Sequence, residues 1–439
     1  MTVSGFKKAV LNPYVIIALS GVLLNISFFI HNIYAQIFAL FIIAPAFFAI
    51  SRLKGIKRYV GGLIFFGSWI IPTCYWYFLI FPWWAALLRL TIFTLMANVF
   101  FIPLIIKKRN IALDFIITIV LWVGIIAARI ELPVTEDWWI PHIAYTQWLN
   151  PLIVQIAGFA GIYGIILIIL LINAAIAYLL TKKKYIPAGI VAIVIIATCL
   201  TGNVLFQNTI GQGDKNIALL AVQSVPSKGF HSENATVEDI ENLKSLTADA
   251  LKDVEREENN IIIAIWPENM VKISEDENIS QFVRENNIYL VYNRAEPNGG
   301  ELPFNTAVLL DSNGEAVLTN YKKHIAPGEK ITSSSKFSSV TVHDIKVVTD
   351  ICYDLHYPDI RERIDGDDLL LAPVDDDRFG SFFPYLHAAD TVFRAVENNI
   401  NIITASTNGP TFYVNRHGVV ERMPLPVYSE DVLVIETKI

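Results

Sequence analysis

The sequence is poor in cysteine. Only three of its 439 residues are cysteine, and Cys74, Cys199 and Cys352 lie far apart along the chain. Thiols so few and so widely spaced predict neither a disulfide framework nor a cysteine-rich metal site. The eight histidines show none of the spacings typical of zinc ligands. We therefore expect a protein without a structural metal and without a metal cofactor.

Charged residues are also scarce. They make up 17% of the chain, whereas 54% of the residues are hydrophobic. This composition argues against an ordinary soluble protein and indicates a membrane protein. The formal net charge of -7 leaves no basic surplus with which to bind nucleic acid. We expect the membrane, and no nucleic acid, among the partners.

The first half of the chain contains seven apolar runs that are long enough to cross a bilayer. The first run is too long for the apolar core of a cleavable signal peptide and is followed at once by another, so we expect it to stay in the protein. The runs cover residues 13–30, 34–50, 59–80, 84–106, 113–130, 152–180 and 186–206.

Basic residues alternate between the loops that connect these runs. The segment before the first run and the loops after the second, fourth and sixth are basic, and the other loops hold almost no Lys or Arg. Because basic loops stay in the cytoplasm, the N-terminus is predicted inside, and seven spans place everything after about residue 206 outside. The basic residues are Lys7, Lys8, Arg52, Lys54, Lys57, Arg58, Lys107, Lys108, Arg109, Lys182, Lys183 and Lys184.

An aromatic loop lies between the fifth and sixth runs. Residues 138–151 include Trp138, Trp139, Tyr145 and Trp148. Trp and Tyr favour the membrane interface, where an apolar ring and a polar edge are both satisfied. This loop is either an ordinary aromatic belt or a guide for a lipid substrate.

From residue 215 the composition changes to that of an α/β domain. Short apolar strands alternate with amphipathic helices and one hairpin, which indicates a layered α/β unit whose strand ends carry the chemistry. We therefore divide the chain into a transmembrane domain, residues 1–210, and a catalytic domain, residues 211–439. The expected strands are 217–223, 260–266, 288–294, 306–310, 316–321, 340–343, 346–351, 369–373, 400–406 and 411–414, and the expected helices are 237–257, 279–285 and 384–398.

Three strand ends each deliver a reactive side chain. Glu268 follows one strand, a lysine pair follows the hairpin, and Cys352 follows a third strand. A carboxylate can accept the proton of a thiol, and an ammonium can stabilise first the thiolate and then a tetrahedral oxyanion. A single cysteine after an apolar strand is more often a small buried residue. The glutamate and the lysines favour acyl transfer through a thioester instead.

Together these segments resemble the carbon–nitrogen hydrolase (nitrilase) superfamily and, within it, the apolipoprotein N-acyltransferase family. The resemblance implies a polytopic α-helical membrane domain followed by an α-β-β-α sandwich on the extracytoplasmic side. The catalytic segments are Trp266-Pro267-Glu268, Tyr321-Lys322-Lys323-His324, Pro327-Gly328-Glu329 and Cys352-Tyr353-Asp354, and residues 145–151, 155–158, 161–164, 173–174, 394–398 and 405–409 support them.

The resemblance implies a role for each site residue. Glu268 is the general base, Cys352 the nucleophile and a lysine the oxyanion stabiliser, while Glu329 holds that lysine and Tyr353 lends its backbone amide to the oxyanion hole. The lysine is open. Counting two residues from Tyr321 gives Lys323, because side chains two apart on a strand share a face, and counting back from His324 gives Lys322. We prefer Lys323.

The implied function is a multi-pass cell-membrane enzyme that moves an acyl chain from phospholipid to the N-terminal amine of a lipoprotein. The alternatives are a membrane-anchored amidase with the same triad, and a non-catalytic scaffold that kept the fold. The sequence departs from the family in three loops: 327–329 is one residue short, Asp354 replaces Glu, and 374–379 lacks tryptophan. We also expect no membrane span after the catalytic domain.

Overall fold

The structure is a computed structural model that describes residues 12–96, 98–99, 110–132, 141–225, 235–255, 261–268, 271–300, 302–326, 328–364, 366, 368–422 and 424–439. It contains two compact units, residues 1–204 and 205–439. Several predicted features lie outside the described residues: the basic residues Lys7, Lys8, Lys107, Lys108 and Arg109, the pair Trp138 and Trp139, and Pro327.

Each apolar run predicted in the first unit contains helix. Among the described residues, four helical stretches are long and apolar enough to cross a membrane: residues Ile33–Ser51, α9 (Ile111–Glu131), α11 (Ala157–Thr181) and α12 (Tyr185–Gln207). These stretches confirm an apolar helical domain, while the count of seven spans remains a prediction. The other helices are α2 (Pro13–Leu24), α3 (Ile26–Phe29), α4 (Ile33–Ile42), α5 (Ala44–Ser51), α6 (Ile56–Thr73), α7 (Tyr77–Ile80), α8 (Trp83–Met96) and α10 (Pro151–Val154), with the 3₁₀ turn η2 (Ile143–Gln147).

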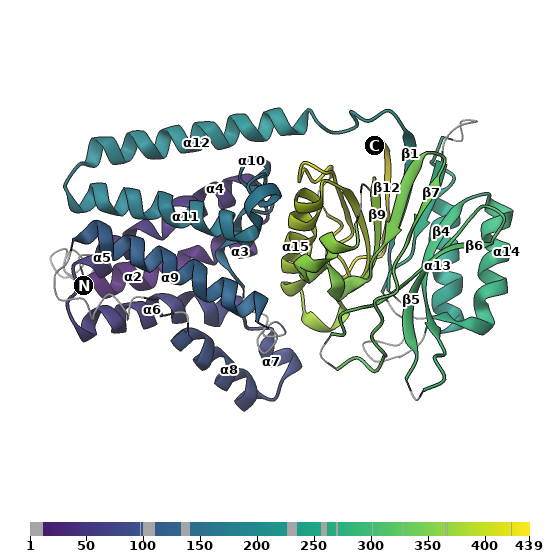
Figure 1. Cartoon of the computed structure of the whole chain (residues 1–439), viewed down its shortest axis with the longest axis horizontal. Coiled ribbons are helices and arrows are strands. Elements are labelled where there is room, and N and C mark those ends of the chain that lie inside the picture. The colour runs from purple at the N-terminus through teal and green to yellow at the C-terminus, as the bar shows by residue number, and fades with distance from the viewer. Residues whose placement is uncertain are drawn as a thin grey trace. The chain divides into compact units, whose positions relative to one another are not determined.

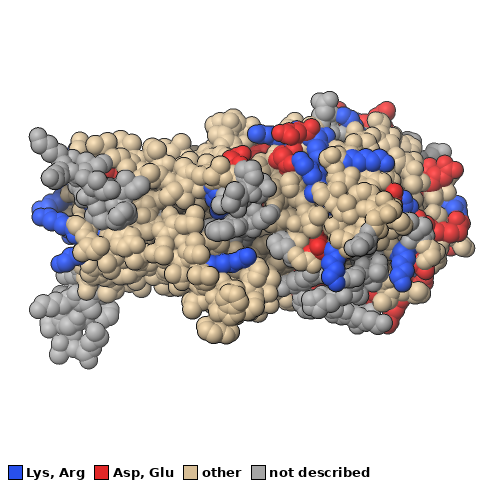
Figure 2. All heavy atoms as spheres, turned by 60° about the horizontal axis from the view of Figure 1, so that its bottom comes forward, with Lys and Arg blue, Asp and Glu red and all other residues tan. Residues whose placement is uncertain are grey.

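Several polar side chains inside the helical unit bond to one another or to the backbone. At the break between α4 and α5, Asn173 of α11 accepts a hydrogen bond from the Ala44 amide at 2.7 Å and donates one to the Leu40 carbonyl at 3.0 Å. Arg58 and Asp114 form a buried ion pair at 2.8 Å between α6 and α9. Such pairing is required where no water can reach. The visible face of this unit is mostly uncharged (Figure 2).

The second unit is built on two β-sheets. The seven-stranded sheet has the order β12-β1-β2-β4-β5-β6, with β3 paired to β4, and the five-stranded sheet has the order β11-β10-β9-β8-β7. The first comprises β1 (Asn216–Gln223), β2 (Ile261–Ile265), β3 (Val271–Lys272), β4 (Tyr289–Glu296), β5 (Phe304–Leu310), β6 (Ala316–Tyr321) and β12 (Asp431–Lys438). The second comprises β7 (Ser339–Val342), β8 (Ile345–Thr349), β9 (Leu369–Asp375), β10 (Asn401–Thr407) and β11 (Phe412–Val414).

The two sheets pack face to face and are covered by helices, as the predicted sandwich requires. Alternate residues of both sheets, among them Leu219, Ile263, Val347 and Leu371, form one apolar core between the sheets. The opposite residues of the larger sheet pack under α13 (Val237–Ala250) and α14 (Asp276–Asn286). Helix α15 (Phe383–Asn398) covers the smaller sheet (Figure 1). Short 3₁₀ turns complete the unit: η3 (Ile273–Glu275), η4 (Cys352–His356), η5 (Pro358–Glu362) and η6 (Asp377–Phe379).

Candidate active site

The carboxyl ends of strands from both sheets meet at the site. Strands β2 and β4 are parallel, as are β8 and β9, so within each sheet their carboxyl ends share one edge. Two hydrogen bonds join the edges of the two sheets. The Glu268 amide donates to the Val374 carbonyl at 3.2 Å, and the Asn320 side chain donates to the Thr349 carbonyl at 3.0 Å. The residues that follow β2, β6 and β8 are thereby brought together.

Lys322 lies between two glutamates. Its Nζ is 2.8 Å from Glu268 Oε1 and 2.6 Å from Glu329 Oε1, and the lysine side chain is fully buried. Burial lowers the pKa of Lys322, but the two carboxylates outweigh burial, so that the pKa lies well above its usual value. The side chain is therefore an ammonium at neutral pH. Glu329 is itself held by the Ala326 amide, which donates to its other oxygen at 2.8 Å.

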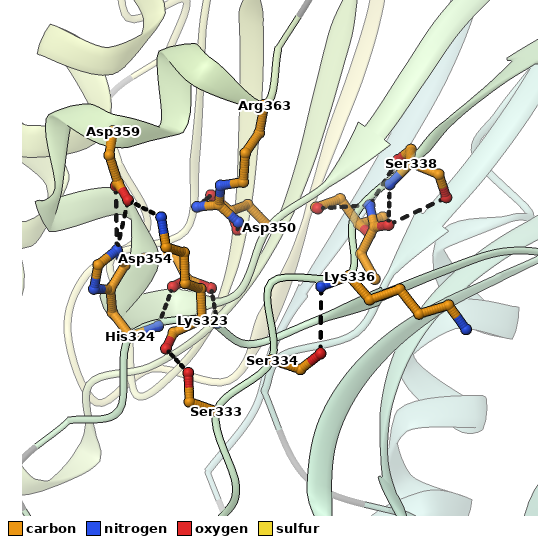
Figure 3. Close-up of polar contacts among 12 residues, drawn as sticks. Lys323, His324, Ser333, Ser334, Lys336, Ser338, Asp350, Asp354, Asp359 and Arg363 are labelled. Carbon is orange, nitrogen blue, oxygen red and sulfur yellow. Dashed lines mark hydrogen bonds and ion pairs between the residues drawn. The ribbon is translucent and has the colours of Figure 1, made fainter.

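The preference for Lys323 is corrected by this geometry. The Nζ of Lys323 pairs instead with Asp359, which also accepts from His324 at 3.0 Å (Figure 3). Strand alternation gives the reason. Leu318 and Asn320 point toward the second sheet, so a position two residues further along, Lys322, continues on the same face.

Glu268 has one engaged and one open oxygen. Oε1 accepts from Lys322 and, at 2.6 Å, from Asn305 Nδ2. Oε2 is buried and has no hydrogen-bond partner among the residues that the structure describes. A buried carboxylate oxygen without a donor is poised to accept a proton.

Cys352 begins the turn η4 and has a left-handed backbone with φ of 45°. This conformation is strained for a residue other than glycine and recurs at reactive positions. The residue as a whole is 6% exposed, and its Sγ lies 3.7 Å from the Asp375 carbonyl oxygen. Burial raises the pKa of the Cys352 thiol well above its usual value, and the Glu268 carboxylate raises it further, while Lys322 opposes both. The resting side chain is a thiol that needs a base.

Asp354 connects the cysteine turn to the lysine loop. Its carboxyl oxygens accept from the backbone amides of Lys323 at 3.2 Å and His324 at 2.7 Å (Figure 3). Burial raises the pKa of Asp354 well above its usual value, and neighbouring Asp350 adds to this rise. Arg363 in turn binds both oxygens of Asp350, at 3.0 and 3.1 Å. The shorter side chain noted at position 354 therefore still reaches the lysine loop.

The structure thus brings Glu268, Lys322, Glu329 and Cys352 together, with Tyr353 next to the thiol. Two residues beside the site were not predicted from the sequence: Asn305, which binds Glu268, and His387, whose Nε2 lies 3.0 Å from the Cys352 carbonyl. A polar residue inside an apolar strand was a usable signal for Asn305; His387 lies in a predicted helix without a local motif. No group of three or more His, Cys, Asp or Glu side chains among the described residues could hold a metal ion.

Two family models match this chain, one in each unit. Residues 257–430 match the family model for carbon-nitrogen hydrolase. The second unit is therefore a carbon–nitrogen hydrolase domain of the nitrilase type. Residues 20–175 match the apolipoprotein N-acyltransferase N-terminal domain. The chain as a whole is apolipoprotein N-acyltransferase-like.

Two curated relatives are similar to most of this chain. The apolipoprotein N-acyltransferase of Geobacter metallireducens is 24% identical over 359 residues, covering 71% of this chain and 66% of the relative. The apolipoprotein N-acyltransferase of Wigglesworthia glossinidia brevipalpis is 26% identical over 337 residues, covering 67% of this chain and 64% of the relative. The chain thus spans slightly less than two thirds of their length. Among solved structures, Saccharomyces cerevisiae Nit3, a member of branch 10 of the nitrilase superfamily, is 16% identical, with a TM-score of 0.43 over 52% of this chain and 91% of that chain.

Proposed function

We propose that the protein is a membrane N-acyltransferase that moves an acyl chain from a phospholipid to the N-terminal amine of a lipoprotein. The observation that carries the proposal is the buried Lys322 ammonium between Glu268 and Glu329, next to the Cys352 thiol. The apolar helical unit and the two relatives named as apolipoprotein N-acyltransferases support a lipid donor and a lipoprotein acceptor.

In the first step, Glu268 Oε2 takes the proton of the Cys352 thiol as the sulfur attacks the ester carbonyl carbon of the phospholipid. A C–S bond forms, and the carbonyl π electrons move to the oxygen. The Lys322 ammonium and the Tyr353 amide stabilise that oxyanion. When the intermediate collapses, the ester C–O bond breaks, and Glu268 returns its proton to the leaving alkoxide. The products are a lysophospholipid and a thioester on Cys352.

In the second step, the amine of the lipoprotein attacks the thioester carbonyl carbon. Glu268 accepts a proton from the amine as the C–N bond forms. The same oxyanion donors serve again. The C–S bond then breaks, and the proton on Glu268 returns to the sulfur, which regenerates the thiol. A water molecule in place of the amine would give the hydrolase chemistry of the amidase alternative.

We place the catalytic unit on the extracytoplasmic side of the cell membrane. The supporting observation is the alternation in the sequence between basic loops and loops that hold almost no Lys or Arg. Outside the cytoplasm, the unit would meet lipoproteins after their translocation. A reporter protein fused after Ile439 should be active only in the outer compartment, and activity in the cytoplasm would refute this placement.

The transferase is tested by mass spectrometry of the purified protein after incubation with phospholipid. The protein should gain the mass of one acyl chain, localised to the peptide containing Cys352, and Cys352→Ala should gain none. An amidase would instead release ammonia or an amine from a small amide without forming a lipid adduct. A wild-type protein that is never acylated by phospholipid would refute the transferase.

A further inference from the structure

A pair of stacked histidines contacts the backbone of Cys352 through His387 and has no part in the steps above. The rings of His356 and His387 are 4.4 Å apart between centroids and nearly parallel. His356 is in the cysteine turn η4, and His387 is in α15. Their side chains are 6% and 3% exposed, and each has an acidic partner: Asp390 for His356 at 2.5 Å, and Asp376 for His387 at 3.0 Å.

His387 hydrogen-bonds to the backbone of Cys352. Its Nε2 is 3.0 Å from the Cys352 carbonyl oxygen, and its Nδ1 is 3.0 Å from Asp376 Oδ1. A carbonyl oxygen can only accept, so Nε2 carries a proton and donates it. Burial lowers the pKa of His387, but the nearby carboxylates of Asp376 and Asp390 outweigh burial and raise it. The donor on the Cys352 carbonyl is therefore the Nε2–H of a buried imidazole whose pKa is raised by two carboxylates.

This hydrogen bond fixes the peptide group between Cys352 and Tyr353. In a trans peptide the carbonyl oxygen and the next N–H point in opposite directions. Holding the Cys352 carbonyl toward His387 thus makes the Tyr353 N–H point away from His387, from the opposite edge of the same peptide plane. A donor on the carbonyl also polarises the peptide, which makes its N–H a stronger donor. The strained φ of 45° at Cys352 is consistent with a peptide held by an external contact.

We propose that His387, held by Asp376, is a positioning residue that aims and polarises the Cys352–Tyr353 peptide so that the Tyr353 N–H stabilises the oxyanion. The proposal rests on the proposed acyl-transfer function, because it assigns Tyr353 to the oxyanion hole. His387 does not touch the reacting atoms. It acts through the backbone of the nucleophile.

Two reactions of the same thiol separate this role from a merely structural one. Acylation by an activated ester, p-nitrophenyl butyrate, passes through a tetrahedral oxyanion. Alkylation by iodoacetamide is a displacement at a saturated carbon and forms no oxyanion. Both require the Cys352 sulfur to be accessible and nucleophilic. The ratio of the two rates therefore isolates stabilisation of the oxyanion.

The test uses His387→Phe, which keeps a ring in the space and removes both donors, and His387→Gln, whose amide can still donate to the carbonyl. His387→Phe should slow acylation about 10–100-fold while changing alkylation by less than about twofold, an effect smaller than the about 10²–10³-fold loss on deleting an oxyanion donor itself. His387→Gln should recover most of the acylation rate. Val392→Ala, a buried control in α15, should leave the ratio of the rates unchanged.

Equal slowing of both reactions in folded His387→Phe, or no slowing of either, would overturn the proposal. If His387→Phe does not fold, the isosteric Asp376→Asn serves instead, and it too must slow acylation more than alkylation. The activated ester needs no phospholipid recognition. A wild-type protein that reacts with this ester but never with phospholipid would therefore refute the proposed function and leave the test of His387 valid.

Discussion

Lys322 Nζ lies 2.8 Å from Glu268 Oε1, and both side chains are shielded from solvent. The two carboxylate oxygens of Glu268 therefore differ. Oε1 accepts hydrogen bonds from Lys322 and Asn305, whereas Oε2 has no donor among the described residues. The carboxylate therefore stays near the thiol as a base without losing its cationic neighbour. Glu329 is a second carboxylate partner of the Lys322 ammonium.

The neighbouring lysines provide a matched pair of variants. Lys322→Met should reduce the rate of Cys352 acylation by at least about 10²-fold, because it removes an oxyanion donor. It should also destabilise the unit by about 3–5 kcal/mol, since a buried carboxylate loses its partner. Lys323→Met, which breaks only the half-exposed pair with Asp359, should keep the acylation rate within about threefold of wild type. Adduct formation followed by mass spectrometry gives both rates. Equal losses in the two variants would contradict the assignment of Lys322.

Glu268→Gln tests the base. Gln can still accept from Lys322 and Asn305 through its carbonyl oxygen, but it cannot take the thiol proton. Because burial holds the pKa of Cys352 high, the variant should hold a neutral thiol at pH 7. Both acylation and iodoacetamide alkylation should slow by about 10²–10⁴-fold. A variant that alkylates at the wild-type rate at pH 7 would show that another group accepts the proton.

The carboxyl group of Asp375 predicts a specific pH dependence of stability. Burial, with the Glu268 charge adding to it, raises the pKa of Asp375 to about 7. An acid whose pKa is higher in the folded state binds a proton on folding. Its contribution is therefore complete below its unfolded pKa, about 3.9, and is lost as the pH rises to 7 and above. Asp375→Asn should flatten this part of the curve of melting temperature against pH between 5 and 8.

Asp368→Asn is the control for that measurement, because its shift has the opposite sign. Burial raises the pKa of Asp368, but the Lys346 amide and the Lys215 ammonium outweigh it, so the pKa is lowered. Its contribution is then present throughout pH 5–8. The substitution should lower the melting temperature by a similar amount across this range and leave the slope unchanged. A slope that is unaltered in Asp375→Asn would refute the raised pKa.

The ion pair in the helical unit predicts a double-mutant result that does not depend on activity. Arg58→Leu leaves the buried Asp114 carboxylate without its partner at 2.8 Å and should cost about 3–5 kcal/mol. Arg58→Leu combined with Asp114→Leu should be close to wild type, because no uncompensated charge remains. Melting temperatures in one detergent measure both. A double variant as unstable as the single one would show that the pair contributes net stability.

Local patterns in the sequence were sufficient for most of the fold. Helix α15 was predicted at 384–398 and is found at Phe383–Asn398, because its apolar spacing and Pro384 mark its first turn. Helix α13 was predicted to reach residue 257 but ends at Ala250. The edge strand β12, Asp431–Lys438, was not predicted. Its apolar run, residues 432–435, is short and lies between polar residues, and the strand pairs along its whole length with β1.

The site was predictable as a set of residue types but not as a geometry. Glu268, Glu329 and Cys352 follow from their segments, whereas the choice between Lys322 and Lys323 needed the face of β6. Leu318 and Asn320 are buried on the face of β6 that points toward the other sheet. Lys322 is two residues further along and therefore continues that face. His387 could not be found in this way. Its partner is a backbone carbonyl 35 residues away, and that contact exists only once α15 covers the sheet.

The most direct test of the central claim is a single-turnover transfer experiment. Protein carrying a labelled acyl chain on Cys352 is mixed with a diacylated lipopeptide, in parallel with the same lipopeptide acetylated on its N-terminal amine. If the thioester on Cys352 is the donor to an amine, the label should leave the protein rapidly and appear in amide linkage on the lipopeptide with the free amine. With the acetylated lipopeptide the label should stay on Cys352. Release of the label as free fatty acid at the same rate with either lipopeptide would contradict it.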